Sequence, residues 1–152
     1  MTLARAELRK LVLPGQRTLH MKQESERRRK QIIDVVEQLV DHGLRLAVYD
    51  AGRAHPERQR RDRCLEALLR DIDRRTETQI TLDRDESLVT WDRQLMIERT
   101  RALGLRGRVT YRHASLHEEI GLIIPDAVAW SWARGGEWRR RVQPLTNVAQ
   151  EV

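Results

Sequence analysis

The stretch TQITLD at residues 78–83 has the clearest strand pattern in the chain. Its side chains alternate, so that Ile80 and Leu82 face one side and polar residues, ending in Asp83, face the other. Segments with helical spacing of apolar residues stand before and after it in the sequence. A half-buried strand between amphipathic helices indicates a protein of the α/β class.

Outward from this strand, helical and extended patterns continue to alternate. The segments are a helix with apolar positions over 32–40 that ends near Gly43, a strand over 44–50, a helix over 64–72, a helix from Leu88 that ends at Gly104, a strand over 109–113 and a helix from Pro125. Ser87 is expected to cap the helix that follows it. This order predicts a single α/β domain over residues 1–152, with a largely parallel sheet and right-handed crossovers. Residues 1–23 are assigned only in part, since 4–13 have a helical pattern and 18–21 are too short to classify.

The composition is basic and rich in arginine. The formal charge is +6, and of the 29 basic residues only Lys10, Lys22 and Lys30 are lysines. Guanidinium groups suit phosphate and carboxylate recognition. A GC-rich genome also replaces lysine by arginine without selection for function, and we regard this as the main cause. The charge alone therefore indicates a nucleic-acid partner only weakly.

The single cysteine and the N-terminal sequence bear on the cellular setting. Cys64 lies among apolar residues at helical spacing, so it is expected to be a small core residue, and an internal disulfide is excluded. The first ten residues do not form a signal peptide, and no uncharged apolar run reaches membrane-spanning length. We therefore expect a cytoplasmic protein without a membrane partner, whose oligomeric state the sequence does not determine.

A carboxylate stands near the start of the late apolar segment IIPDAVAWSW at residues 123–132. Pro125 suits the first position of a helix, and Asp126 then lies where the positive end of the helix dipole favours an anion. Two interpretations follow for Asp126. It is either a ligand of a divalent cation or a helix-terminus charge that pairs with Arg134 or with a backbone amide.

Asp83 ends its predicted strand, at the edge of the sheet where ligands gather in open α/β folds. If Asp83 and Asp126 converge, they are candidate catalytic ligands of Mg²⁺ or Mn²⁺, and metal-activated hydrolysis of a phosphodiester becomes the natural chemistry. Asp85 and Glu86 are candidate metal ligands in support. The alternative is that residues 83–86 form a solvated turn before the next helix.

The segment 130–141 combines three tryptophans with four arginines. Indole rings stack on bases while guanidinium groups hold phosphates, so this composition suits nucleic acid. The alternative is that Trp130 packs in the core and the arginines are solvated. No dinucleotide-binding, phosphate-loop or serine-hydrolase motif is present in the sequence. The candidate nucleic-acid contacts are Arg134, Trp138, Arg139, Arg140 and, from the N-terminal part, His20.

Three parts of the chain resemble the bacterial DUF3800 family. They are His20 with Glu24 and Ser25 ahead of an arginine-rich helix, the strand ending in Asp83, and LIIPDAVAW at residues 122–130. The last part is similar to that family's "LQxADxxA" helix, with Pro125 in place of the usual alanine. The resemblance implies a ribonuclease H-like three-layer α/β fold, with a mostly parallel sheet flanked by helices. It also implies an acidic cluster drawn from three places, of which Asp83 and Asp126 match two.

The third place in that family is an opening strand with an Asp-Glu-Ser-Gly motif, which has no counterpart before Leu11. We expect either that the coding sequence begins upstream of Met1 or that this member lacks the first strand and one metal ligand. The leading hypothesis is a ribonuclease H-like, divalent-metal-dependent nuclease, which could be degenerate. The alternative is a non-catalytic domain that binds nucleic acid or protein, and a third hypothesis is a structural subunit completed by another chain.

Overall fold

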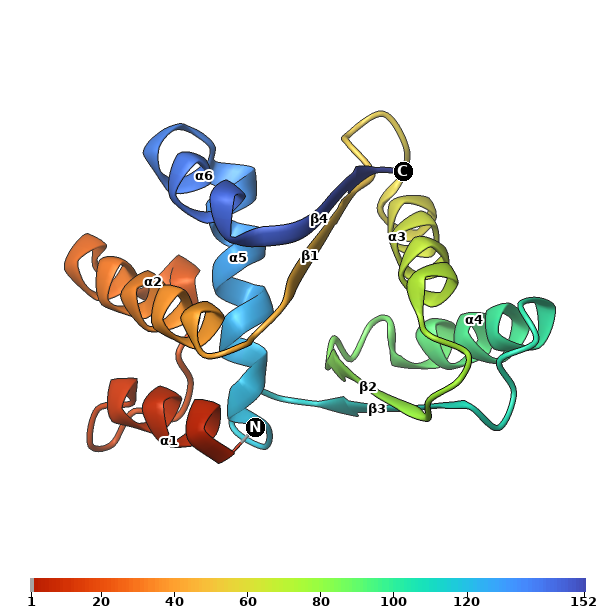
Figure 1. The fold of residues 1–152 in the computed structure, drawn as a ribbon, viewed down its shortest axis with the longest axis horizontal. Coiled ribbons are helices and arrows are strands. Elements are labelled where there is room, and N and C mark those ends of the chain that lie inside the picture. The colour runs from red at the N-terminus through yellow and green to blue at the C-terminus, as the bar shows by residue number, and fades with distance from the viewer. Residues whose placement is uncertain (1) are drawn as a thin grey trace. The chain divides into compact units, whose positions relative to one another are not determined.

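The computed structural model describes residues 2–152 of the chain (Figure 1). A single domain over residues 1–152 was predicted from the sequence. The structure divides into two compact units. Unit 1 comprises the residues up to Val48 together with Ser115–Val148. Unit 2 comprises Tyr49–Ala114 and Ala149–Val152.

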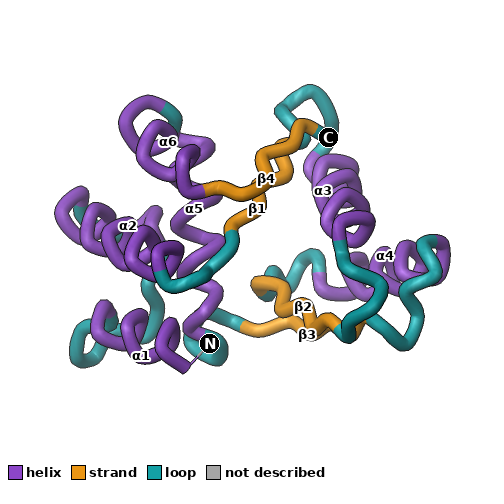
Figure 2. Tube along the Cα trace, viewed as in Figure 1, coloured by secondary structure: helices purple, strands orange, loops and turns teal. Residues whose placement is uncertain are grey.

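The elements follow the order expected from the sequence, with further elements at both ends (Figure 2). Unit 1 contains helices α1 (Thr2–Leu11), α2 (Glu26–Asp41), α5 (Ile123–Arg134) and α6 (Gly136–Val142), and the short 3₁₀ turns η1 (Met21–Gln23), η2 (Ile120–Leu122) and η3 (Gln143–Leu145). Unit 2 contains α3 (Glu57–Asp71), β2 (Thr78–Asp83), α4 (Val89–Ala102) and β3 (Val109–Ala114). Strands β1 (Leu46–Asp50) and β4 (Thr146–Glu151) pair with each other.

In unit 1, α2 packs against both α1 and α5. The buried face of α2 includes Ile32, Ile33 and Val36, which are fully buried and were predicted from their helical spacing. Ser25 caps this helix, since its hydroxyl oxygen accepts a hydrogen bond from the backbone N–H of Arg28 at 3.2 Å. Local sequence patterns therefore predict the buried face of α2.

In unit 2, β2 and β3 run parallel, in a register that aligns Thr78 with Val109 and Asp83 with Ala114. The α3 and α4 helices supply a core cluster, and Ile80 and Leu82 of β2 pack against it. This confirms the predicted strand and its apolar face. The core cluster is formed by Leu65, Leu69, Leu95, Met96, Leu105 and Val109.

The second pair of strands, β1 and β4, also runs parallel. The backbone N–H of Leu46 donates to the side-chain oxygen of Asn147 at 3.0 Å, and the N–H of Val152 donates to the carbonyl of Asp50 at 2.9 Å. Within residues 2–152 the strands thus form two separate two-stranded sheets. The α/β class is confirmed, while the ribonuclease H-like arrangement stays a prediction.

Two local predictions need correction. The predicted cap at Ser87 is wrong, because α4 begins at Val89 and the Ser87 hydroxyl donates to the Asp85 carboxylate at 2.6 Å instead. Helix α5 begins at Ile123, two residues earlier than its pattern suggested. Pro125 still fits, because it lies in the first turn, where backbone N–H groups have no partner within the helix. In the part of the chain that the structure describes, no helix is both long and apolar enough to cross a membrane.

Candidate functional site

Asp126 lies in the first turn of α5, with 28% of its side chain exposed. Its Oδ2 accepts a hydrogen bond from the backbone N–H of Met21 at 2.9 Å. Its Oδ1 lies 3.7 Å from Nδ1 of His20. A backbone amide is therefore its closest partner, as one of the two interpretations of Asp126 expected. The carboxylate fixes the start of η1 against α5.

Arg29, on α2, holds the same segment from its carbonyl side. Its Nε donates to the carbonyl of Met21 at 2.7 Å, and its Nη2 donates to the carbonyl of Lys22 at 3.0 Å. The guanidinium carbon also lies 4.4 Å from the centre of the Trp130 ring. The η1 turn, which follows His20, is thus held between the Asp126 carboxylate of α5 and the Arg29 guanidinium of α2.

The tryptophan side chains of α5 and α6 pack against each other and against arginines. Trp130 and Trp138 make an edge-to-face contact, with ring centres 5.2 Å apart and planes at 81°. Arg139 stacks over Trp132, with its guanidinium carbon 4.2 Å from the ring centre. Gly135 separates the two helices with a φ of +73°, a backbone conformation that residues other than glycine adopt rarely. We name Trp132, Arg134, Trp138, Arg139 and Arg140 the Trp/Arg surface of unit 1.

The arginines of this region differ in their partners. Arg141 pairs with Glu37 at 2.8 Å and also with Asp34, so acids of α2 neutralise it. Arg134 and Arg140 are exposed, and the guanidinium group of neither makes a hydrogen bond or ion pair within the described residues 2–152. The Trp/Arg surface therefore presents cations that no acid of the described chain compensates.

The acids after β2 lie in unit 2. Asp83 is the exposed last residue of that strand. The carboxylate of Asp85 accepts hydrogen bonds from the hydroxyl of Ser87 at 2.6 Å and from its backbone N–H at 3.0 Å, which lowers the pKa of Asp85. Glu86 is exposed and lies 4.0 Å from Arg84. These contacts agree with the solvated turn that was the alternative to a metal site.

Of the predicted metal ligands, Asp83, Asp85 and Glu86 belong to unit 2, and Asp126 belongs to unit 1. Among residues 2–152, no group of three or more histidine, cysteine, aspartate or glutamate side chains is arranged to hold a metal ion. The meeting of Asp83 and Asp126 at a Mg²⁺ or Mn²⁺ ion stays a prediction.

A buried acid that the sequence analysis did not single out lies in unit 2. Asp92 of α4 is 0% exposed and accepts hydrogen bonds from Nε and Nη2 of Arg61, at 2.6 and 2.7 Å. Nε2 of His113 lies 3.0 Å from the same carboxylate. Burial opposes ionisation of Asp92, but its contacts with Arg61 and His113 outweigh burial and lower the pKa of this carboxyl. Asp92 precedes Leu95 and Met96 by three and four residues, a helical spacing that places it on the buried face.

No family model, curated protein or solved structure matches this chain. Membership of the DUF3800 family therefore stays a prediction.

Proposed function

We propose that this protein binds nucleic acid without cutting it, and that the Trp/Arg surface of unit 1 makes the contact. The observation that carries the proposal is the stacking of Arg139 on the half-buried Trp132, next to the exposed Arg134 and Arg140. Arginine and tryptophan in this arrangement offer both phosphate contacts and stacking faces. His20 is a further candidate contact in the same unit.

The charge balance supports an anionic ligand over a cationic one. The chain carries +6, and Arg134 and Arg140 have no acidic partner within the described residues. Trp138 packs its ring against Trp130 and is half-buried, so part of the indole remains open to solvent. Bases that stack on such rings must be unpaired, so we propose single-stranded nucleic acid as the ligand.

The first experiment measures binding of a fluorescein-labelled oligothymidine by anisotropy over a range of salt concentrations. The double variant Arg134→Gln/Arg140→Gln should bind more weakly. Its slope of log affinity against log salt should fall by roughly 1.4, at about 0.7 for each lost contact with a single strand. The matched control is Arg106→Gln/Arg108→Gln, which removes the same charge from exposed residues of unit 2.

If both double variants lose affinity equally, binding reflects total charge and the Trp/Arg surface is not the site. Trp138→Ala provides a second measurement, since loss of stacking should weaken binding by about 1–3 kcal/mol at any salt concentration. Circular dichroism shows whether each variant is folded. If the folded protein binds no oligonucleotide at all, the proposal fails and the protein-binding and structural-subunit hypotheses gain support.

The metal-dependent nuclease is the rival hypothesis from the enzyme class. It requires cleavage of a labelled single strand or duplex that depends on Mg²⁺ or Mn²⁺ and is lost in Asp83→Asn and Asp126→Asn. Asparagine retains a carbonyl oxygen for the Met21 amide, so Asp126→Asn removes the charge while keeping an acceptor at η1. Such cleavage would replace the proposal of a non-catalytic binder.

A further inference from the structure

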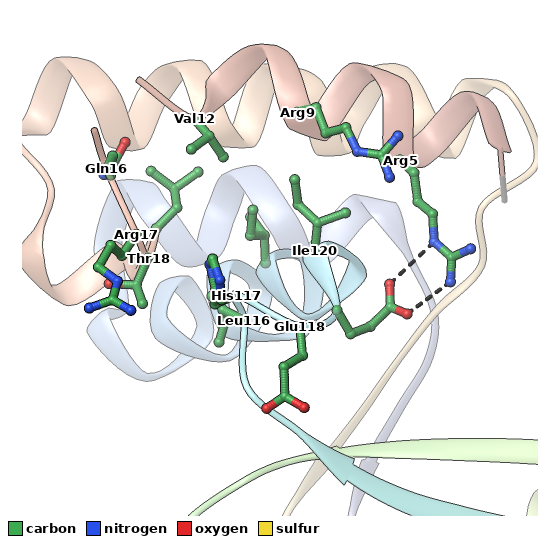
Figure 3. Close-up of a pocket in the computed structure, with 13 residues that line it drawn as sticks. Arg5, Arg9, Val12, Gln16, Arg17, Thr18, Leu116, His117, Glu118 and Ile120 are labelled. Atoms are coloured by element: carbon green, nitrogen blue, oxygen red, sulfur yellow. Dashed lines mark hydrogen bonds and ion pairs between the residues drawn. The ribbon is translucent and has the colours of Figure 1, made fainter. Parts of the chain in front are cut away.

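Unit 1 contains a pocket of about 630 Å³ that the proposed nucleic-acid surface does not use (Figure 3). Its walls come from α1, from the segment 16–19 and from the segment 116–120 that leads into α5. Its volume lies within the range of about 300–1,000 Å³ that is typical of small-molecule sites. Ile123 lines the pocket and Trp132 lies nine residues further along α5, about 14 Å away at the rise of a helix. The pocket and the Trp/Arg surface are therefore separate features.

The acids that line this pocket are already engaged by the protein. Glu119 forms a two-point ion pair with Arg5, from Nε at 3.3 Å and from Nη2 at 2.8 Å, which Figure 3 shows as dashed lines. Glu119 also accepts the backbone N–H of Gly121 at 3.1 Å. Glu118 accepts hydrogen bonds from the hydroxyl and the backbone N–H of Ser115, at 3.0 and 3.2 Å. The negative charges of the lining are thus held in place by groups of unit 1 itself.

Two of the lining arginines are not engaged in this way. Arg9 on α1 and Arg17 on the segment 16–19 are exposed, and the guanidinium group of neither makes a hydrogen bond or ion pair with another described residue. In Figure 3 their guanidinium groups lie well apart, with the His117 ring between them in this view. Each fork presents several N–H donors that match a carboxylate or a phosphate. The pocket therefore has unused donors for an anion.

The remaining lining consists of the polar residues Gln16, Thr18 and His117 and of five apolar residues. Leu19, Leu116 and Ile123 line the pocket and are 1%, 5% and 2% exposed, so they form a well-packed wall. Val12 and Ile120 are half-buried and extend it. An apolar wall beside unpaired guanidinium groups suits a ligand with an anionic head and an apolar body.

We propose that this pocket binds a small organic anion. Arg9 or Arg17 holds the carboxylate or phosphate monoester of the ligand, and its apolar body lies against Leu19, Leu116 and Ile123. The proposal does not depend on nucleic-acid binding, because none of these residues belongs to the Trp/Arg surface.

The test uses anilinonaphthalene sulfonate, an apolar anion whose fluorescence rises on binding, as the probe of the full-length protein. Decanoate and adenosine monophosphate serve as competitors that separate a carboxylate from a phosphate monoester. Inorganic phosphate is the competitor without an apolar body. We expect at least one organic anion to displace the dye, and inorganic phosphate to need a concentration at least about tenfold higher, since burial of a few methylene groups contributes more than 1.4 kcal/mol.

The double variant Arg9→Gln/Arg17→Gln should raise the dissociation constant of the displacing anion by at least about tenfold. The Arg106→Gln/Arg108→Gln variant removes the same charge from exposed residues of unit 2 and should leave it unchanged. The four substituted arginines are all exposed, so both double variants should fold. Circular dichroism of each variant checks this. The proposal is overturned if no organic anion displaces the dye, if inorganic phosphate competes equally well, or if the two double variants behave alike.

Discussion

Replacing Asp92 by asparagine should destabilise the protein far more than a comparable change at a more exposed acid. The Asp92 side chain is completely buried and accepts two hydrogen bonds from Arg61, at 2.6 and 2.7 Å. Asparagine has nearly the same size but no charge, and one of its two polar atoms is a donor. One guanidinium N–H of Arg61 would therefore face a donor inside the protein.

The size of the effect follows from the burial of the two partners. Breaking a fully buried ion pair costs about 3–5 kcal/mol. The Arg61 side chain is 29% exposed, so water can partly solvate the guanidinium left behind. We therefore expect Asp92→Asn to lower the free energy of unfolding by about 2–3 kcal/mol. At about 2–4 °C per kcal/mol for a chain of this size, the melting temperature should fall by about 4–12 °C.

The matched control is Asp62→Asn. Asp62 makes a similar two-point contact with Arg99, at 2.9 and 2.6 Å, but its side chain is 26% exposed and that of Arg99 is 34% exposed. Exposed pairs contribute about 0–1 kcal/mol, so this variant should lose less than half as much stability as Asp92→Asn. Urea unfolding followed by circular dichroism measures both. Equal losses, or a loss below about 0.5 kcal/mol at Asp92, would refute the argument from burial.

The same variant has a defined pH dependence. The pKa of Asp92 in the folded protein is lowered from its ordinary value near 3.9. A lowered carboxyl pKa adds stability that is present above the unfolded value and is lost as the pH falls through the folded value. The stability difference between the wild type and Asp92→Asn should therefore be full at neutral pH and should shrink below about pH 4. A difference that stays constant down to the acid transition would contradict the assignment.

Three further measurements test other parts of the structure. Ser25→Ala removes the cap of α2 and should cost about 1 kcal/mol in urea unfolding. Ser87→Ala should cost less, because the Ser87 hydroxyl caps no helix, and the reverse order would favour the sequence-based assignment. Met96→Ala removes a fully buried side chain from the core of unit 2 and should cost about 2–5 kcal/mol, and a loss below that range would place Met96 outside a packed core. Burial raises the pKa of the Cys64 thiol, so a thiol reagent should modify the native protein more slowly than the urea-unfolded protein, and equal rates would show an accessible thiol.

The sequence predicted those elements whose signals are local. The α2 helix shows its buried face through the spacing of Ile32, Ile33 and Val36, and β2 shows its face through Ile80 and Leu82. Each of these patterns repeats within a single element, so no knowledge of the neighbouring chain is needed to recognise it. The order of helices and strands, and with it the α/β class, follows from such signals.

The arrangement of the strands could not be predicted in the same way. Strand β4 pairs with β1 across about a hundred residues, and its residues 147–151 are exposed, so it lacks an alternating apolar pattern. Pairing between distant segments depends on contacts that no local window contains. For that reason the sequence indicated one largely parallel sheet, whereas the described strands form two separate pairs.

The candidate site shows the same division between local and distant signals. Asp126 was predicted from its place at a helix start, and a backbone amide was one of the two partners expected for it. The amide belongs to Met21, 105 residues away in sequence. Asp92 has a clear signal, since it shares a helical face with Leu95 and Met96. Asp92 was nevertheless not predicted, although it lies in the first turn of α4.

Two acids of this protein are satisfied by the chain itself, whereas the arginines at the two proposed binding sites are not. The buried carboxylate of Asp92 faces Arg61 and His113, and Asp126 accepts a backbone amide. Asp83 is exposed, and a lone hydrated carboxylate holds a divalent cation weakly, because such ions prefer several oxygen ligands. The guanidiniums of Arg134 and Arg140 on the Trp/Arg surface and of Arg9 and Arg17 in the pocket beside α1 have no partner within the described residues. Since a charged group without an internal partner is free to meet a ligand, these four arginines support the two proposals of anion recognition.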